Sequence, residues 1–192
     1  FVQAGCWWRE FCGDEDFVMD LGDNILKSGV TNLVGSFEAG GYDAGIALQE
    51  VDNPKAFGIA DVDNEGNVTE LIEKPDDPPT NLALIGMYVF SPAVFDAIDA
   101  LEPSWRGELE ITDAIQSLLE DGYAIDSHVV TGWWKDTGKP EDILEANRLV
   151  LEEADLTTAG VIEDGAEVDG RIELDESATI KDGAVVRGPV SI

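Results

Sequence analysis

The sequence has few basic residues and a single histidine. Eleven lysines and arginines stand against 41 aspartates and glutamates, giving a formal net charge of −30. Because nucleic acids and anionic membrane surfaces are bound through basic patches, this charge argues against both as partners. The acidic residues are spread through amphipathic segments, so a disordered acidic tail is not indicated. Such spread acidity is typical of halophilic proteins, in which salt screens self-repulsion, and we expect the fold to loosen at low salt.

Cysteine and long apolar runs are also scarce. Cys6 and Cys12 are too few for a disulfide scaffold and match no metal motif, so we expect buried or incidental thiols. No apolar stretch is long enough to span a membrane, and no signal peptide is recognisable, so we expect a cytoplasmic protein. The sequence starts at Phe1 and stops within a repeat, and we therefore expect both ends to be truncated.

Two aspartates are expected where apolar strands end. Asp136 precedes residues 137–140, where a proline followed by acidic residues favours the start of a helix. Asp23 follows the predicted strand 17–21. Ligands of open α/β sheets bind at such edges, and two carboxylates could share one Mg²⁺. For either aspartate alone, a helix cap or turn residue is the simpler interpretation.

Strands and helices alternate over residues 17–153, and the apolar run 82–90 is typical of a central strand buried on both faces. This alternation predicts an α/β fold: a partial Rossmann-like domain whose mixed, mainly parallel sheet carries helices on both faces. The expected strands are 17–21, 44–51, 57–62, 68–73, 82–90 and 124–131, and the expected helices are 30–40, 91–101, 111–119 and 140–153.

An aliphatic residue recurs every six positions after residue 155, with a mostly small residue two places before it. The aliphatic positions are Ile162, Val168, Leu174, Ile180, Val186 and Ile192. This period is typical of a parallel β-helix, in which each aliphatic points inward and the small residue lets the chain turn a corner. Its exposed edge favours a symmetric partner, so we expect a homo-oligomer. The predicted domains are 1–155 and 156–192.

Short motifs occur in order along the chain. They are Leu21-Gly22-Asp23-Asn24, Phe57-Gly58, Glu73-Lys74-Pro75, the octapeptide from Arg106 to Asp113, and the hexapeptide from Trp133 to Gly138. Over about residues 13–192, they resemble the sugar-nucleotide pyrophosphorylases. The resemblance is closest to glucose-1-phosphate thymidylyltransferases of the long form, which end in a left-handed β-helix. The high acidity resembles that of haloarchaeal proteins.

The resemblance implies nucleotidyl transfer from a nucleoside triphosphate, dTTP, to a sugar 1-phosphate, glucose 1-phosphate, with release of pyrophosphate. It implies catalytic roles for Asp23 and Asp136, which would hold Mg²⁺, and for Lys74, which would bind the sugar phosphate. The implied substrate-binding residues are Asn24, Gly58, Glu73, Lys74, Leu84 and Arg106.

Each implied role has a plainer alternative. Glu73 would accept hydrogen bonds from sugar hydroxyls, and Lys74 would bind the phosphate. The same two residues could instead form a surface ion pair. Gly58 would let the sugar approach the backbone, or it could simply begin a strand. Arg106 would bind phosphate, or it could hold Glu108 or Glu110.

Residues 1–12 contain no Gly-rich loop with the arginine and lysine that grip the triphosphate in this family. We therefore expect an N-terminally truncated domain with little or no turnover on its own. Two other function classes stay open: a non-catalytic assembly or regulatory subunit, and a sugar-phosphate acyltransferase that uses the β-helix. The short β-helix without histidine disfavours the acyltransferase.

Overall fold

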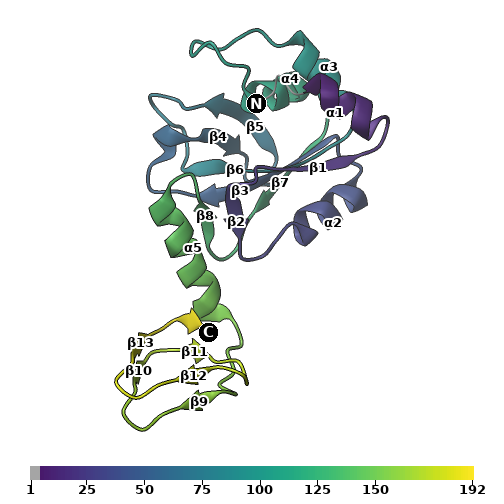
Figure 1. The fold of residues 1–192 in the computed structure, drawn as a ribbon. Coiled ribbons are helices and arrows are strands. Elements are labelled where there is room, and N and C mark those ends of the chain that lie inside the picture. Colours follow the sequence, from purple (N-terminus) through teal and green to yellow (C-terminus); the bar gives the residue numbers. More distant parts are fainter. Residues whose placement is uncertain (1–4) are drawn as a thin grey trace. The chain divides into compact units, whose positions relative to one another are not determined.

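The computed structural model describes residues 5–192, with side chains from Trp8 onward (Figure 1). By contacts the chain divides into two compact units, the first ending at Trp134 and the second covering Lys135–Ile192. This division differs from the predicted domain bounds, 1–155 and 156–192, which stay a prediction. Within residues 5–192, no helix is both long and apolar enough to cross a membrane.

The first unit is built on a six-stranded sheet with the order β5-β4-β6-β3-β7 and with β1 also paired to β6. The sheet strands are β1 (Phe17–Asp20), β3 (Ala44–Glu50), β4 (Gly58–Val62), β5 (Val68–Glu73), β6 (Leu82–Phe90) and β7 (Ile125–Val129). The helical segments are α1 (Gly5–Cys12), α2 (Thr31–Gly40), η2 (Pro54–Ala56), α3 (Ala93–Ala100) and α4 (Ile111–Glu120), and a short strand β2 covers Asn24–Leu26.

The sheet is mixed, as expected, but the prediction that it is mainly parallel is wrong. Strand β6 runs antiparallel to β1, β3 and β4, and β4 and β5 form an antiparallel hairpin. Among the described sheet pairs of this unit, only β3 and β7 are parallel. One reason is the connection between β4 and β5: only a short turn joins these neighbouring strands, whereas parallel neighbours need a longer crossover.

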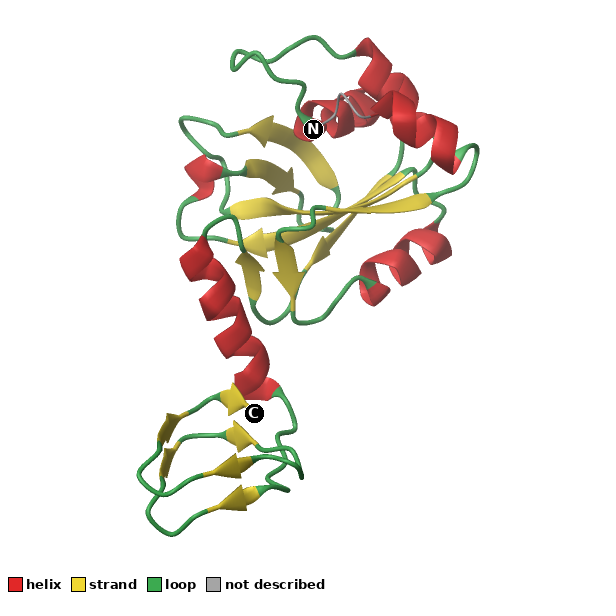
Figure 2. Cartoon of the chain, in the orientation of Figure 1, coloured by secondary structure: helices red, strands yellow, loops and turns green. Residues whose placement is uncertain are grey.

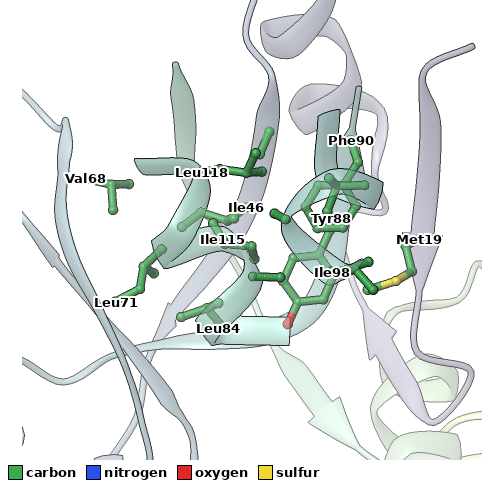
Figure 3. Close-up of a cluster of buried hydrophobic side chains, with 14 of the residues drawn as sticks. Met19, Ile46, Val68, Leu71, Leu84, Tyr88, Phe90, Ile98, Ile115 and Leu118 are labelled. Atoms are coloured by element: carbon green, nitrogen blue, oxygen red, sulfur yellow. The ribbon is translucent and has the colours of Figure 1, made fainter. Parts of the chain in front are cut away.

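Strand β6 is buried on both faces, as its apolar run predicted. Since side chains alternate along a strand, Leu84, Tyr88 and Phe90 pack in one cluster and Ile85, Met87 and Val89 in another. The first cluster contains residues of α3 and α4 (Figure 3), and the second contains residues of α2. Helices therefore cover both faces of the sheet (Figure 2). Helix α2 ends where expected, with Gly41 in the left-handed conformation at its C-cap.

The second unit contains α5 (Pro140–Glu153) and short strands joined in parallel pairs. The strands are β9 (Val161–Ile162), β10 (Glu167–Asp169), β11 (Ile172–Glu173), β12 (Thr179–Ile180), β13 (Val185–Arg187) and β14 (Val190–Ser191). Val161 pairs with Thr179, Glu167 with Val185 and Ile172 with Val190, so each pair joins residues eighteen positions apart. This spacing equals three of the predicted hexads.

The core of this unit corrects one expectation about the hexads. Leu174 and Ile180 are buried, as predicted, but Ile162 is 40% exposed and Ile192 47% exposed. Ile172, Ala178 and other residues expected only at corners also pack into the core. The aliphatic position and the small position of each hexad lie two residues apart. Both side chains therefore point to the same side of the chain and lie in the interior.

Candidate functional site

The β4–β5 hairpin brings two predicted site residues opposite each other. Gly58, at the start of β4, pairs with Glu73, at the end of β5. Lys74 follows directly, and its N–H donates to the carbonyl of Phe57 at 3.1 Å. Lys74 has a φ of 42°, and no other described non-glycine residue has a positive φ. Such a left-handed conformation is strained for a residue with a side chain, and strained residues are often found at functional sites.

Glu73 is the centre of a partly buried polar cluster. Thr112 donates its hydroxyl to Glu73 Oε2 at 2.7 Å, and Arg106 Nη1 lies 3.4 Å from Glu73 Oε1. Lys74 Nζ lies 3.7 Å from the same Oε1. Because these partners hold both carboxylate oxygens, the orientation of the Glu73 side chain is well defined.

Arg106 contacts Glu108 and Glu110, as the plainer alternative to a phosphate-binding role predicted. Its guanidinium lies 3.0 Å from Glu110 Oε1 and 3.4 Å from Glu108 Oε2, in addition to Glu73. The hydroxyl of Ser104 also donates to Glu110 Oε1, at 3.1 Å. Three carboxylates thus surround one guanidinium, so Arg106 anchors Glu73 in this structure. A role toward phosphate stays a prediction.

Two residues of this cluster were missed from the sequence as site residues, and so was Tyr88, a core residue whose pKa is affected by Glu73. Thr112 and Glu110 belong to the octapeptide motif, which was the available signal, but spacing did not show that they reach Glu73 and Arg106. Tyr88 gave no signal because it lies within the apolar run of β6. Burial raises the pKa of the Tyr88 hydroxyl, and the negative charge of Glu73 raises it further.

Gly58 has no room for a side chain. A Cβ there would lie 2.5 Å from Thr112 Oγ1 and 3.0 Å from Glu73 Oε2. The glycine is thus needed for the close packing of this cluster, whereas approach of a sugar remains a prediction. Leu84 is only 6% exposed and packs in the core cluster of α3 and α4, so its side chain serves packing.

Asp23 and Asn24 form a second group of predicted site residues. Asn24 donates its amide to Asp23 Oδ1 at 2.9 Å and accepts the indole N–H of Trp134 at 2.7 Å. Gly86 lies against them, since a Cβ there would be 2.8 Å from Asn24 Nδ2. Burial raises the pKa of the nearby Asp20, and the charge of Asp23 raises it further. This repulsion between carboxylates is what a bound cation would relieve.

Asp136 belongs to the second unit and has the local setting predicted for it. The strand β8 (Trp134–Asp136) ends at this residue, and α5 begins at Pro140. Its Oδ1 accepts the N–H of Gly138 at 2.9 Å. Lys135 is held to α5 by Asp142 at 2.8 Å and Glu145 at 2.6 Å, and these hydrogen bonds raise its pKa.

A shared metal ion between Asp23 and Asp136 remains a prediction. Residues 5–192 contain no group of three or more His, Cys, Asp or Glu side chains that could hold a metal. Carboxylate oxygens suit Mg²⁺, which commonly binds one or two carboxylates and completes its shell with substrate oxygens and water. The donor type therefore fits Mg²⁺, provided that substrate supplies further ligands.

A cavity of about 380 Å³ opens beside the Glu73 cluster. It lies between the end of the edge strand β5 and the segment that precedes and begins α4. Its polar lining comprises Glu73, Lys74, Asp76, Ser104 and Asp113, and the indole of Trp105 also lines it. The volume lies in the range of small-molecule sites, and two of the predicted site residues face it.

The chain is similar in sequence to several nucleotidyltransferases. The low-salt glycan biosynthesis nucleotidyltransferase Agl11 of Haloferax volcanii is 79% identical over 175 residues, which are 91% of this chain and 49% of that protein. Glucose-1-phosphate thymidylyltransferase of Streptomyces griseus is 44% identical over 184 residues, covering 96% of this chain and 52% of that protein. The chain thus spans about half the length of these relatives.

Solved structures support the fold. A Bacillus anthracis protein assigned as a glucose-1-phosphate thymidylyltransferase, crystallised with sucrose, superposes with a TM-score of 0.71 at 34% identity, over 82% of this chain and 63% of that one. A UDP-glucose pyrophosphorylase in complex with UDP-glucose has a TM-score of 0.72 at 22% identity, over 80% of this chain and 62% of that one. The second likeness concerns the fold alone.

A sequence profile of the family described as Nucleotidyl transferase matches residues 1–153. The match includes residues 1–12, which lie outside the range over which the motifs showed a resemblance, and in the structure Trp8 and Cys12 pack against the main core. Cys12 is a free thiol, while the side chain of Cys6 lies outside the described residues. On this match and this fold, the chain belongs to the Nucleotidyl transferase family.

Proposed function

We propose that the chain is part of an enzyme that transfers a nucleoside monophosphate from a nucleoside triphosphate to a sugar 1-phosphate. The proposed substrates are dTTP and glucose 1-phosphate, and the proposed products are dTDP-glucose and pyrophosphate. The observation that carries the proposal is the cluster of Glu73, Lys74 and Arg106 beside the cavity at the end of β5. The thymidylyltransferase named above, 44% identical to this chain, supports the choice of substrates.

The reaction requires positioning and charge neutralisation more than covalent participation of the protein. An oxygen of the sugar phosphate attacks the α-phosphorus of the triphosphate, a new P–O bond forms, and the bond to pyrophosphate breaks. Glu73, held by Thr112 and Arg106, accepts hydrogen bonds from sugar hydroxyls. Lys74 binds the sugar phosphate as a point charge.

Asp23 and Asp136 are the residues that would hold Mg²⁺. A bound Mg²⁺ supplies charge neutralisation for the phosphates as pyrophosphate leaves. The chain contributes the carboxylate oxygens and their orientation. Asn24 steadies Asp23, and the N–H of Gly138 steadies Asp136.

We also propose that the hexad segment forms a left-handed β-helix through which copies of the protein associate. The parallel pairs eighteen residues apart support a regular coil. A cytoplasmic location and adaptation to high salt complete the proposal. The charge of −30 supports the salt adaptation.

Calorimetric titration of the chain with glucose 1-phosphate in molar KCl tests the sugar-phosphate site. Glu73→Gln removes a charged acceptor and is expected to weaken binding about 10- to 100-fold. Glu70→Gln is the matched control, because Glu70 lies exposed on the same strand. Equal affinities for the two variants would contradict the proposed site. Competition between dTTP and UTP in pyrophosphate release by the full-length enzyme tests the base.

A further inference from the structure

Trp105 is unusually exposed for a tryptophan. Its exposed fraction is 83%, whereas Trp8, Trp133 and Trp134 are partly buried. A tryptophan side chain can bury about 150–250 Å² of largely apolar surface, and this surface is left in water here. The indole nevertheless lines the cavity that also contains Glu73 and Lys74. The indole is therefore placed to cover a ligand that binds in this cavity.

The turn that carries Trp105 is held in place by its own hydrogen bonds. Ser104 N–H donates to the carbonyl of Glu108 at 2.8 Å, and Gly107 N–H donates to the carbonyl of Ser104 at 2.8 Å. The N–H of Arg106 also donates to the Ser104 hydroxyl, at 3.2 Å. Because Ser104 and Arg106 both bond to Glu110, the turn is tied to the Glu73 cluster. The backbone on either side of Trp105 is therefore fixed at the cavity rim.

The cavity lining indicates a ligand rich in hydroxyl groups. Glu73, Asp76 and Asp113 supply carboxylate acceptors, while Lys74 supplies a cation at the same wall. A purely anionic ligand would meet repulsion from three carboxylates. A sugar ring that carries one phosphate satisfies both features, since its hydroxyls donate and its phosphate pairs with lysine. The apolar face of such a ring is the surface that an indole can cover.

We propose that Trp105 is a specificity-determining residue that stacks on the sugar ring of a bound sugar phosphate in this cavity. The inference rests on the proposed function, because it takes the sugar phosphate as the ligand. It adds a contact from the turn before α4 that recognises the ring, whereas Lys74 recognises the phosphate. Discrimination between a sugar phosphate and phosphate alone thus depends on Trp105 as well as on Glu73.

Calorimetry in molar KCl with glucose 1-phosphate and with inorganic phosphate tests this role. Trp105→Ala is expected to weaken binding of glucose 1-phosphate about five- to tenfold and to leave phosphate binding unchanged. Trp105→Phe, which keeps an aromatic ring, is expected to restore most of the affinity. Phe11→Ala is the matched control, since Phe11 is 91% exposed on α1 and does not line the cavity.

The outcomes separate the two levels of the proposal. If the unsubstituted chain does not bind glucose 1-phosphate, the proposed function fails and this inference fails with it. If the unsubstituted chain binds and Trp105→Ala binds equally well, only the role of Trp105 is refuted. If Trp105→Ala weakens both ligands equally, the residue supports the structure of the site and does not recognise the ring, which also overturns the proposal.

Discussion

Replacing Lys74 by glycine should leave the fold more stable than replacing it by alanine, while both changes weaken substrate binding. Lys74 has a φ of 42°, a left-handed conformation that glycine adopts without steric cost. Lys74→Ala is the matched control, because it removes the same ammonium group and keeps a Cβ. The ion pair with Glu73, at 3.7 Å, is lost in both variants. The difference between the two variants therefore reports the backbone strain at this position.

The size of the difference follows from two opposing terms. A left-handed conformation costs a residue with a Cβ about 1–2 kcal/mol, which glycine avoids. Glycine makes the unfolded chain more flexible, and this offsets about 0.4–1 kcal/mol. We therefore expect Lys74→Gly to be more stable than Lys74→Ala by about 0.5–1 kcal/mol. For a chain of this size, that corresponds to a rise in melting temperature of about 1–4 °C.

Denaturant unfolding in molar KCl measures this difference, and calorimetry with glucose 1-phosphate measures the functional loss. Both variants are expected to bind glucose 1-phosphate about 10- to 100-fold more weakly, because both lack the charged donor. A Lys74→Gly variant no more stable than Lys74→Ala would refute the claim of strain. Unchanged affinity in both variants would refute the role of Lys74 toward phosphate.

Three further predictions concern packing, pH and salt. Gly58→Ala should cost about 1–3 kcal/mol of stability, because its Cβ would overlap Thr112, and the cost should fall in a Thr112→Ala background; additive costs in denaturant unfolding would contradict this. Burial raises the pKa of the Asp113 carboxyl, and the charge of Glu110 raises it further. The protonated carboxyl therefore stabilises the fold fully at pH values below 3.8, its ordinary pKa, and this stabilisation is lost as the pH rises through the raised pKa. Asp113→Asn should therefore unfold at no lower denaturant concentration than the unsubstituted chain at neutral pH, and a clearly lower midpoint would argue against it. The melting temperature should rise between dilute buffer and molar KCl, since salt screens the net charge of −30, and a flat response would count against salt adaptation.

Much of the fold could be predicted because local patterns determine it. The apolar run of β6 indicated burial on both faces, and a core cluster on each face of the strand confirms it. The expected strands 57–62 and 68–73 correspond to β4 and β5, which pair as an antiparallel hairpin. This antiparallel pair is one reason why the sheet is not mainly parallel. The predicted alternation of strands and helices over residues 17–153 does not hold for β4, β5 and β6, which no helix separates.

The candidate site was less accessible to sequence reasoning. Glu73, Lys74 and Arg106 were found through their motifs, and the structure brings them together. Their partner Thr112 lies 39 positions from Glu73, and periodicity does not report a contact over such a separation. Tyr88 was indistinguishable from its apolar neighbours, because it lies within the apolar run of β6.

Binding of Mn²⁺, followed by electron paramagnetic resonance in the presence of glucose 1-phosphate, tests the proposed metal site most directly. If Asp23 and Asp136 hold one ion, Asp23→Asn and Asp136→Asn should each abolish the same binding event. The double variant should then lose no more than either single variant. If each single variant retains half of the bound Mn²⁺ and only the double variant loses it all, the two carboxylates bind separate ions and the proposed metal site is wrong.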